Sequence, residues 1–321
     1  MNSNIILIVL GEPNSIFSEI LFKYFKSKSF KMNKSRIILI GNKKLFEKQM
    51  KQLKYRLYLN EIFEVNEALK KKINIINIQY KFRKIFSKIN SSSKQYIENC
   101  FDEAIRLIKN KNLTKLINGP VSKTHFLKKK FPGITEYIGF KTNTKNPVML
   151  IYNENLSVVP LTTHTPLKYV AKHVKKKKII NTVKIVDQFY KTKLRKKPKF
   201  AILGLNPHCE STDRISEEKK EIIPAINVLN KNKINISGPY AADTFFLEKN
   251  INKFDAVIGM YHDQVLTPAK TLFKFEAINI TIGLPFLKIT PDHGPNQDMM
   301  GKNKSDPTSI FYAFNFLNKI K

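Results

Sequence analysis

Cysteine is scarce in the sequence, and this scarcity limits both cysteine-based metal sites and disulfide bonds. Its two cysteines, Cys100 and Cys209, stand far apart and form no CxxC pair. A structural zinc site built from cysteines is therefore excluded, and a disulfide framework is not expected. Cys209 directly follows His208, so it is interpreted either as a neighbour of a functional site or as a small buried side chain, the more common role of a free cysteine.

Long apolar stretches are also missing. No run approaches the roughly 20 apolar residues that span a bilayer. The apolar run 5–10 is too short for a signal peptide, and it lacks a basic segment before it and a small-residue cleavage site after it. There is no internal repeat, low-complexity tail or long Gly/Ser/Pro linker. These absences predict a soluble, cytoplasmic, globular protein of one large or two medium domains.

The glycine-rich fingerprint GxGxxG is absent, so the sequence gives no support for a Rossmann dinucleotide site. The segment 11-GEPNSIF is a turn that opens a helix. The amino end of such a helix can hold an anion, although a single glycine makes this a weak signal.

Acidic residues are few: the sequence has 25 of them against 57 lysines and arginines, which gives a formal net charge of +32. Such an excess is typical of proteins that bind nucleic acid or anionic lipid. Here very few of the basic residues are arginine, the residue that contacts phosphates and bases in a bidentate manner, and the lysines are spread along the chain. We therefore expect neither nucleic acid nor membrane as a partner. The lysine runs 128–130 and 175–178 are expected on solvated helix faces or turns, with a modest attraction for anionic substrates.

Short apolar runs of strand type alternate with longer amphipathic segments. The predicted strands are residues 5–10, 36–40, 73–78, 115–117, 148–152, 157–161, 200–205, 256–260 and 277–282. The predicted helices are residues 16–26, 44–54, 92–110, 166–173, 179–191, 217–230 and 306–318. This alternation, with continuous apolar strands, predicts an α/β fold whose sheet is largely parallel and buried on both faces.

Three of the six histidines share one context, because each follows a predicted strand. They are His164 in 161-LTTHTP, His208 in 204-GLNPHCE and His262 in 259-GMYHDQ. Ligands bind at the carboxyl ends of strands in open α/β sheets. If the three strand ends are neighbours, three imidazoles converge, and three nitrogens with an open position form a catalytic site for a divalent metal. In the alternative interpretation, each histidine caps a strand or bonds to a backbone group.

The other chemically capable side chains have less certain roles. Asp263 and Asp243 are placed to orient a ligating imidazole or to hold a cationic substrate group. Asp243 has a second interpretation as the N-cap of a helix over residues 244–247. His173 is expected on a helix surface, and His125 lies at the start of a basic helix and is ambiguous.

The order of these motifs resembles one enzyme family, the 4-hydroxythreonine-4-phosphate dehydrogenases of pyridoxal phosphate biosynthesis. The resemblance runs nearly end to end and rests on 118-NGPVSK, 133-GITEYI, 161-LTTHTPL, 204-GLNPHCE, 238-GPYAADTFF, 259-GMYHDQVLTPAK, 278-INITIGLPF and 291-PDHG. It implies the two-lobed α/β fold of isocitrate and isopropylmalate dehydrogenases with a central cleft, in a homodimer. The lobes are expected at residues 1–140 with 290–321, on the cofactor side, and at 141–289, on the metal and dimerisation side.

The resemblance also implies a reaction and a set of roles. Members oxidise 4-phosphohydroxy-L-threonine with NAD or NADP to 2-amino-3-oxo-4-phosphooxybutanoate, which decarboxylates to 3-amino-2-oxopropyl phosphate. A divalent metal (zinc, magnesium or cobalt) is implied at His164, His208 and His262, with one histidine donated by the partner subunit. The implied substrate contacts are Thr135, Lys270, Asn279 and Lys288, and the implied cofactor neighbours are His293 and Gly294. Asp243, Asp263 and Lys123 are candidates for the general base.

Three departures from the family pattern concern the substrate. Ile134 stands where the family has a histidine, Lys288 stands where it has an arginine, and 11-GEPNSIFSE carries fewer glycines than usual. Isoleucine can neither donate nor accept a hydrogen bond, and lysine lacks the bidentate fork of arginine. These changes keep two alternatives open: a related phospho-hydroxyacid dehydrogenase with an altered substrate, and an inactive member that survives as a partner protein.

Overall fold

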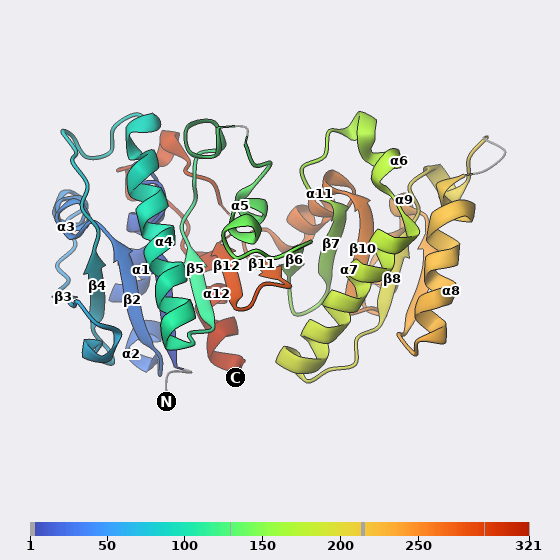
Figure 1. The fold of residues 1–321 in the computed structure, drawn as a ribbon, viewed down its shortest axis with the longest axis horizontal. Helices are drawn as coiled ribbons and strands as arrows, with labels where there is room; N and C mark the ends of the chain where they lie inside the picture. Colours follow the sequence, from blue (N-terminus) through green and yellow to red (C-terminus); the bar gives the residue numbers. More distant parts are fainter. Residues whose placement is uncertain (1–3, 129, 213–215, 292, 321) are drawn as a thin grey trace. The chain divides into compact units, whose positions relative to one another are not determined.

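The protein divides into two units, and within each unit the strands pair in a parallel or mixed arrangement. The computed structural model describes residues 4–128, 130–212, 216–291 and 293–320 (Figure 1). Lys129 of the predicted lysine run and Asp292 of the 291-PDHG motif lie outside them. The first unit comprises Met1–Lys145 and Leu284–Lys321, and the second comprises Asn146–Gly283.

The sheet of the first unit is parallel throughout, in the order β3-β4-β2-β1-β5-β12. Its strands are β1 (Ile5–Val9), β2 (Arg36–Gly41), β3 (Leu59–Glu61), β4 (Ile73–Asn77), β5 (Lys115–Asn118) and β12 (Leu287–Pro291). The central strand β1 has the sequence IILIV, and every residue of it is buried. A strand with apolar side chains on both faces needs a layer of helices on each side, and both layers are present.

The helices of the first unit supply these two layers (Figure 1). They are α1 (Phe17–Lys26), α2 (Lys28–Met32), α3 (Lys43–Gln52), α4 (Lys94–Lys111), α5 (Ile134–Lys141) and α12 (Thr308–Lys319), with the short turns η1 (Val65–Glu67), η2 (Ser91–Ser93), η3 (Lys123–Leu127) and η8 (Gln297–Met299). Helix α4 packs against β1 and β2, and α1 contacts α3 and α12 in the other layer. In α4 the residues Ile97, Phe101, Ala104 and Ile108 recur at helical spacing and are buried in one core cluster.

The second unit has a mixed sheet in the order β11-β6-β7-β10-β8-β9. Its strands are β6 (Val148–Tyr152), β7 (Ser157–Thr162), β8 (Phe200–Leu203), β9 (Ile236–Tyr240), β10 (Ala256–Tyr261) and β11 (Ile278–Ile282). Strand β6 runs antiparallel to both neighbours, and the strands from β7 to β9 are parallel. The three strands that precede the predicted metal histidines, β7, β10 and β8, are therefore adjacent and point the same way.

The helices of the second unit also lie on both faces of their sheet (Figure 1). They are η4 (Leu167–Tyr169), α6 (Val170–His173), α7 (Lys176–Phe189), η5 (Tyr190–Leu194), η6 (Pro207–Cys209), η7 (Glu218–Ile222), α8 (Ile223–Lys231), α9 (Ala242–Phe245), α10 (Glu248–Ile251) and α11 (His262–Phe273). Helices α7 and α8 pack together, while α11 packs on β7 and β10. Val265, Ala269 and Phe273 of α11 are buried in the same core cluster as Val257 of β10.

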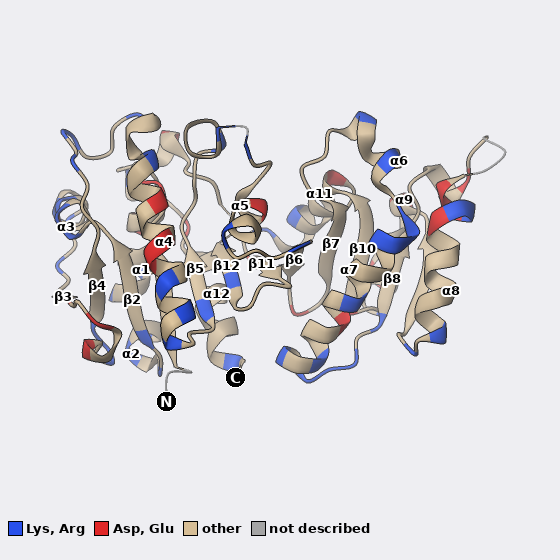
Figure 2. Ribbon diagram, in the orientation of Figure 1, with Lys and Arg blue, Asp and Glu red and all other residues tan. Residues whose placement is uncertain are grey.

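The basic residues are dispersed, as predicted from the sequence. Figure 2 shows lysine and arginine on helices and loops of both units, with acidic residues between them. Lys175, Lys176 and Lys177 are exposed where α7 begins, and so are Lys128 and Lys130. Among the described residues, no helix combines the length and the apolar composition needed to cross a bilayer.

Candidate active site

Two of the three predicted metal histidines lie side by side in the second unit. His164 follows β7 after one intervening residue, and His262 is the first residue of α11, directly after β10. Their ring centroids are 6.0 Å apart, and the planes are inclined by 34°. Two imidazoles that share a zinc ion, with Zn–N bonds of about 2.1 Å, place their centroids about 5–6 Å apart. The pair therefore fits two ligands of one metal.

The imidazole of His262 is oriented by its neighbour in the chain. Its Nδ1 lies 2.7 Å from Oδ1 of Asp263, and the side chain of Asp263 is 79% exposed. An ionised carboxylate only accepts hydrogen bonds, so Nδ1 carries the proton and donates it. The lone pair is then on Nε2, which is the form of histidine that binds a metal.

His208 does not join the other two histidines within one chain. It lies in η6 after β8, its side chain is 76% exposed, and its Nδ1 is 3.8 Å from Oδ2 of Asp243. Across the described ranges of a single chain, no three His, Cys, Asp or Glu side chains form a group that could hold a metal ion. Completion of the metal site by a histidine of a partner subunit stays a prediction.

The turn that carries His208 is strained and firmly held. His208 and Cys209 both have left-handed backbone, with φ of 55° and 62°. Such residues cost about 1–3 kcal/mol each and persist only where the surroundings impose them. A Cβ on Gly204 would lie 2.7 Å from Sγ of Cys209, so the turn also requires glycine there. The strain indicates that the direction of the His208 side chain is imposed by the fold.

Cys209 itself is half-buried, and Cys100 is fully buried.

Two residues that the sequence analysis did not assign hold this turn in place. Glu218 is buried, and its Oε1 accepts hydrogen bonds from the backbone N–H of Leu205 at 2.8 Å and of Asn206 at 2.9 Å. Burial alone would raise the pKa of Glu218, but these hydrogen bonds outweigh it and lower the pKa. Gln264 accepts from Met260 N–H and donates to Gly204 O, each at 2.7 Å. It thereby ties the end of β10 to the turn after β8.

The acidic candidates for the general base line one groove of about 590 Å³ in the second unit. Asp243 and Asp263 face it together with Tyr261 and apolar residues of α9 and α11. The interpretation of Asp243 as an N-cap was wrong, because α9 begins after Ala241 and has no side-chain cap, which places Asp243 inside the first turn. The third candidate, Lys123, is exposed in η3 of the first unit.

The two substrate candidates of the second unit lie at different depths. Lys270 is exposed on α11, where its ammonium group is accessible to an anion. Asn279 is half-buried in β11, opposite Ile151 of β6. Its Oδ1 is buried and accepts no hydrogen bond from any described residue. A buried amide oxygen without a partner is costly, so a donor on a bound ligand would stabilise it.

The two substrate candidates of the first unit, Thr135 and Lys288, are buried. Thr135 is 1% exposed in the first turn of α5, and Lys288 is 0% exposed on β12. Burial lowers the pKa of Lys288 to about 7, and the carboxylate of Glu136 opposes this shift. Ile134, which stands where the resembled family has a histidine, is half-buried and packs on the apolar core.

The cofactor candidates lie after β12 in the first unit. His293 packs its ring 5.9 Å from that of Phe17, and its Nδ1 is 3.0 Å from the carbonyl oxygen of Gly294. A Cβ built on Gly294 would meet no atom within 4 Å. The backbone at Gly294 is therefore open to close approach by a ligand, as a nucleotide-binding loop requires. Of the remaining histidines, His173 is exposed on α6, and His125 is half-buried in η3.

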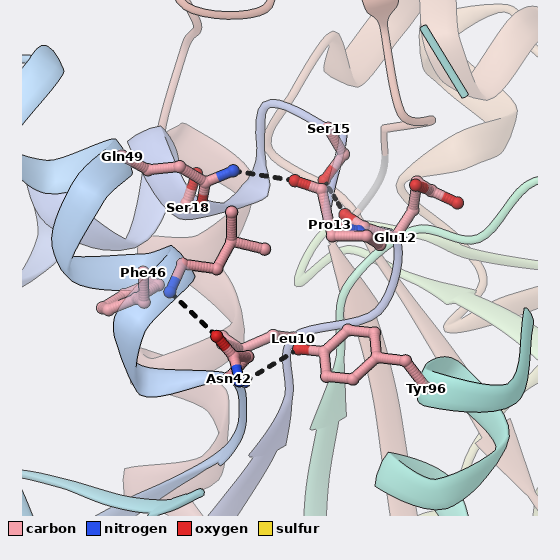
Figure 3. Close-up of a pocket in the computed structure, with 10 residues that line it drawn as sticks. Leu10, Glu12, Pro13, Ser15, Ser18, Asn42, Phe46, Gln49 and Tyr96 are labelled. Carbon is pink, nitrogen blue, oxygen red and sulfur yellow. Dashed lines mark hydrogen bonds between the residues drawn. The ribbon is translucent and has the colours of Figure 1, made fainter. Parts of the chain in front are cut away.

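The turn before α1, where the sequence carries a weak signal for an anion site, contains a buried carboxylate. Glu12 is 1% exposed, and its carboxylate accepts from Asn14 N–H at 3.1 Å and from Ser93 Oγ at 3.1 Å. It lines a cavity of about 20 Å³, large enough for one water molecule, together with Ser18, whose Oγ has no hydrogen-bond partner among the described residues (Figure 3). Burial raises the pKa of Glu12 to about 7.

We expect Glu12→Gln to stabilise the protein at neutral and alkaline pH but not near pH 4.5. Between pH 4.5 and 7 the folded state binds more protons at Glu12 than the unfolded state, so stability falls as pH rises through that window. Glutamine removes the buried charge, and its amide can still accept from Asn14 N–H and donate to Ser93 Oγ. The free energy of unfolding in urea should rise by about 2–3 kcal/mol at pH 8 and change little at pH 4.5. The exposed control Glu47→Gln should show no such dependence; an equal gain at both pH values would contradict the assignment.

Comparison with solved structures defines the class of fold. Isocitrate dehydrogenase from Methylococcus capsulatus matches with a TM-score of 0.54 at 10% identity, over 98% of this chain and 84% of that one. A 4-hydroxythreonine-4-phosphate dehydrogenase from Klebsiella pneumoniae matches with a TM-score of 0.80 at 25% identity, over 98% of both chains. The protein therefore has the isocitrate dehydrogenase-like α/β fold that the sequence predicted.

Sequence comparison then defines the family within this class. A sequence model of the pyridoxal phosphate biosynthetic protein PdxA matches residues 33–317. The 4-hydroxythreonine-4-phosphate dehydrogenase of Sulfurihydrogenibium sp. strain YO3AOP1 is 38% identical over 313 residues, which cover 95% of each chain. The chain belongs to the PdxA family of pyridoxal phosphate biosynthetic proteins.

Proposed function

We propose that the protein is a homodimeric 4-hydroxythreonine-4-phosphate dehydrogenase that depends on NAD or NADP and on a divalent metal. It would oxidise 4-phosphohydroxy-L-threonine to 2-amino-3-oxo-4-phosphooxybutanoate, which loses carbon dioxide to give 3-amino-2-oxopropyl phosphate. The observation that carries this proposal is the 38% identity to a relative of that name over 95% of both chains. The pairing of His164 and His262 supports it from the structure.

The chain's own residues supply binding, orientation and proton transfer in this proposal. His164 and His262 of one subunit and His208 of its partner would hold the metal, which when bound polarises the substrate hydroxyl and stabilises enolate charge. Asp263 keeps His262 in the ligating tautomer. Because Asp263 is engaged in this way, we assign acceptance of the hydroxyl proton to Asp243, which faces the same groove. The nicotinamide ring, when bound, would accept the hydride from the carbon that carries this hydroxyl.

The substrate's charged and polar groups would be met by the remaining candidates. Lys270 presents an accessible positive charge, and Asn279 presents an unsatisfied acceptor for an ammonium or hydroxyl donor. Thr135 and Lys288 would contribute from the first unit. The segment at His293 and Gly294 would receive the dinucleotide, because the backbone there is open.

A substrate-panel assay tests the proposed function. Protein reconstituted with zinc, magnesium or cobalt is incubated with NAD or NADP and phosphorylated hydroxyacids, and nicotinamide reduction is followed by absorbance. Reduction is expected with 4-phosphohydroxy-L-threonine, loss of activity with a chelator, and recovery when metal is restored. Reduction with a different member of the panel would support the altered-substrate alternative. No reduction with any member would refute both and favour an inactive partner protein.

The environment of Ile134 makes substrate specificity testable by a single substitution. Ile134 begins α5, next to the buried Thr135. We expect Ile134→His to lower KM for 4-phosphohydroxy-L-threonine by about tenfold, because a charge-assisted hydrogen bond contributes about 1.5–3 kcal/mol. The apolar control Ile134→Leu should leave KM unchanged. Steady-state kinetics measure both, and an unchanged or higher KM in the histidine variant would favour a different natural substrate.

A further inference from the structure

The loop before α12, described over residues 293–307, carries the candidate cofactor neighbours. In its described part, residues 293–307, the only regular element is the short turn η8. A loop without a ladder of backbone hydrogen bonds takes its position from contacts with other segments. The segments that hold it are therefore expected to control whatever binds against it.

Glu19 of α1 is the main anchor of this loop. Its side chain is completely buried. Oε1 accepts a hydrogen bond from Ser305 N–H at 2.6 Å, and Oε2 accepts one from Asn303 N–H at 3.1 Å. A buried carboxylate is stable only when its oxygens receive such bonds, so Glu19 and the loop backbone depend on each other.

Lys23, one helical turn later, completes the same clamp. Its Nζ lies 2.9 Å from Oε1 of Glu19. It also donates to the carbonyl oxygens of Ser305 at 2.6 Å and Asn303 at 3.3 Å. The two side chains together bind both the N–H and the C=O of two loop residues. This fixes the orientation of those peptide groups as well as their distance from α1.

The start of the same helix contacts the other end of the loop. Ile16, the N-cap residue of α1, donates its backbone N–H to Pro295 O at 3.1 Å, and Phe17 packs against His293. Helix α1 is therefore a common support for the candidate nucleotide segment at 293–295 and for the clamped segment at 303–305. A loosened clamp would leave the open backbone at Gly294 without a fixed position.

We propose that Glu19 and Lys23 are positioning residues for the nicotinamide dinucleotide: they hold the loop after β12 in the form that binds it. This inference rests on the proposed function, and it adds residues that touch neither the substrate nor the metal. Pre-organisation of a loop acts mainly on ligand affinity, because the ordering cost is removed before the ligand arrives. The clamp should therefore affect dinucleotide binding much more than the chemical step.

The test compares Glu19→Gln and Lys23→Met with two exposed controls, Glu47→Gln and Lys31→Met. Hydrogen–deuterium exchange of the backbone amides at 303 and 305 reports the loop, and a fluorescence titration with NADH reports binding without turnover. Both clamp variants should show at least about tenfold faster exchange at these amides and about tenfold weaker NADH binding, with the larger effect for Glu19→Gln. kcat at saturating dinucleotide and KM for the phosphorylated substrate should stay within about threefold. The controls should match the wild type.

Lys23→Met keeps the inference testable if Glu19→Gln fails to fold, because Lys23 is partly exposed and both Glu19 bonds to the loop backbone remain. Unchanged exchange in Lys23→Met, or faster exchange with unchanged NADH affinity, would overturn the proposal. So would an equal loss of affinity in the controls. If the wild-type protein binds neither NADH nor NADPH, the dinucleotide role falls together with the proposed cofactor. That outcome differs from failure of the clamp alone, in which the wild type and the variants bind NADH equally.

Discussion

His208→Ala is expected to lower kcat by about a thousandfold or more while leaving the fold intact. The loss follows from the proposed metal site, since Lewis-acid stabilisation of the reaction supplies several kcal/mol. The fold should survive because the His208 side chain is 76% exposed and contributes nothing to the core. Measured side by side, kcat, bound metal by mass spectrometry and Tm should show lost activity and lost metal with little change in Tm.

His173→Ala is the matched control, because His173 is also exposed but lies on α6 and is not among the residues that line the candidate groove. It should retain full activity and metal. If His208→Ala kept the wild-type kcat when metal is supplied, the assignment of His208 as a metal ligand would be wrong.

The same residue also tests whether the metal site is shared between subunits. Within one chain His164 and His262 are neighbours, and His208 belongs to no three-residue group of ligands in the described ranges. Mixing His208→Ala with His262→Ala subunits produces heterodimers in which one site carries both substitutions and the other carries neither. If His208 and His262 of one site come from different subunits, as proposed, random mixing restores about a quarter of wild-type activity. If all three ligands come from one chain, no activity returns.

The sequence predicted well those parts of the fold that depend on apolar periodicity. All nine predicted strand ranges overlap observed strands, because short runs rich in β-branched residues, such as IILIV, are typical of buried strands. The placement of His164 and His262 at neighbouring strand ends was also predictable, since it requires only that β7 and β10 be adjacent. The family followed from the order of short motifs spread along the chain.

The missed elements are those whose sequences mix polar and apolar residues. Strand β9 has the sequence ISGPY and strand β3 has only LNE, so neither has the pattern of a buried strand. Helix α11 begins at His262 and contains Pro268, which normally marks the end of a helix. Strand β12 contains Lys288 in the middle of an apolar sequence, and only tertiary burial explains a lysine there.

Side chains that support the site through the backbone were also beyond sequence reasoning. Glu218, Gln264 and Glu19 each receive hydrogen bonds from backbone N–H groups, and Gln264 also donates to a carbonyl of a different segment. A glutamate or glutamine in a helix is typical of an exposed face. Nothing in the local pattern shows that its carboxylate or amide is buried against a loop. Only the three-dimensional arrangement reveals that these residues fix the loops on which the candidate ligands lie.

Lys288→Met is expected to change how stability depends on pH. In the wild type the folded pKa of Lys288 is about 7, against 10.5 for the ordinary group, because burial disfavours the ammonium form. Below pH 7 both folded and unfolded states are protonated, and the full cost of burying the charge is present. Between pH 7 and 10.5 the unfolded state binds more protons, so stability at this position rises with pH. Methionine removes the titrating group and therefore this rise.

The slope of the free energy of unfolding against pH is a more robust observable than the difference in that free energy between wild type and variant at one pH. Below pH 7, where Lys288 is charged in the folded protein, methionine also leaves the Glu136 carboxylate without its positive neighbour, which costs stability there. The double variant Lys288→Met/Glu136→Gln removes this cost. From pH 7 to 10, urea unfolding should show the wild type gaining on the order of 4 kcal/mol relative to either variant. For the exposed control Lys31→Met, the curve of unfolding free energy against pH should run parallel to that of the wild type. A wild-type curve parallel to that of Lys288→Met over this range would mean that Lys288 holds its proton inside the folded protein, and the charge proposed for the substrate's anionic group would then be permanent.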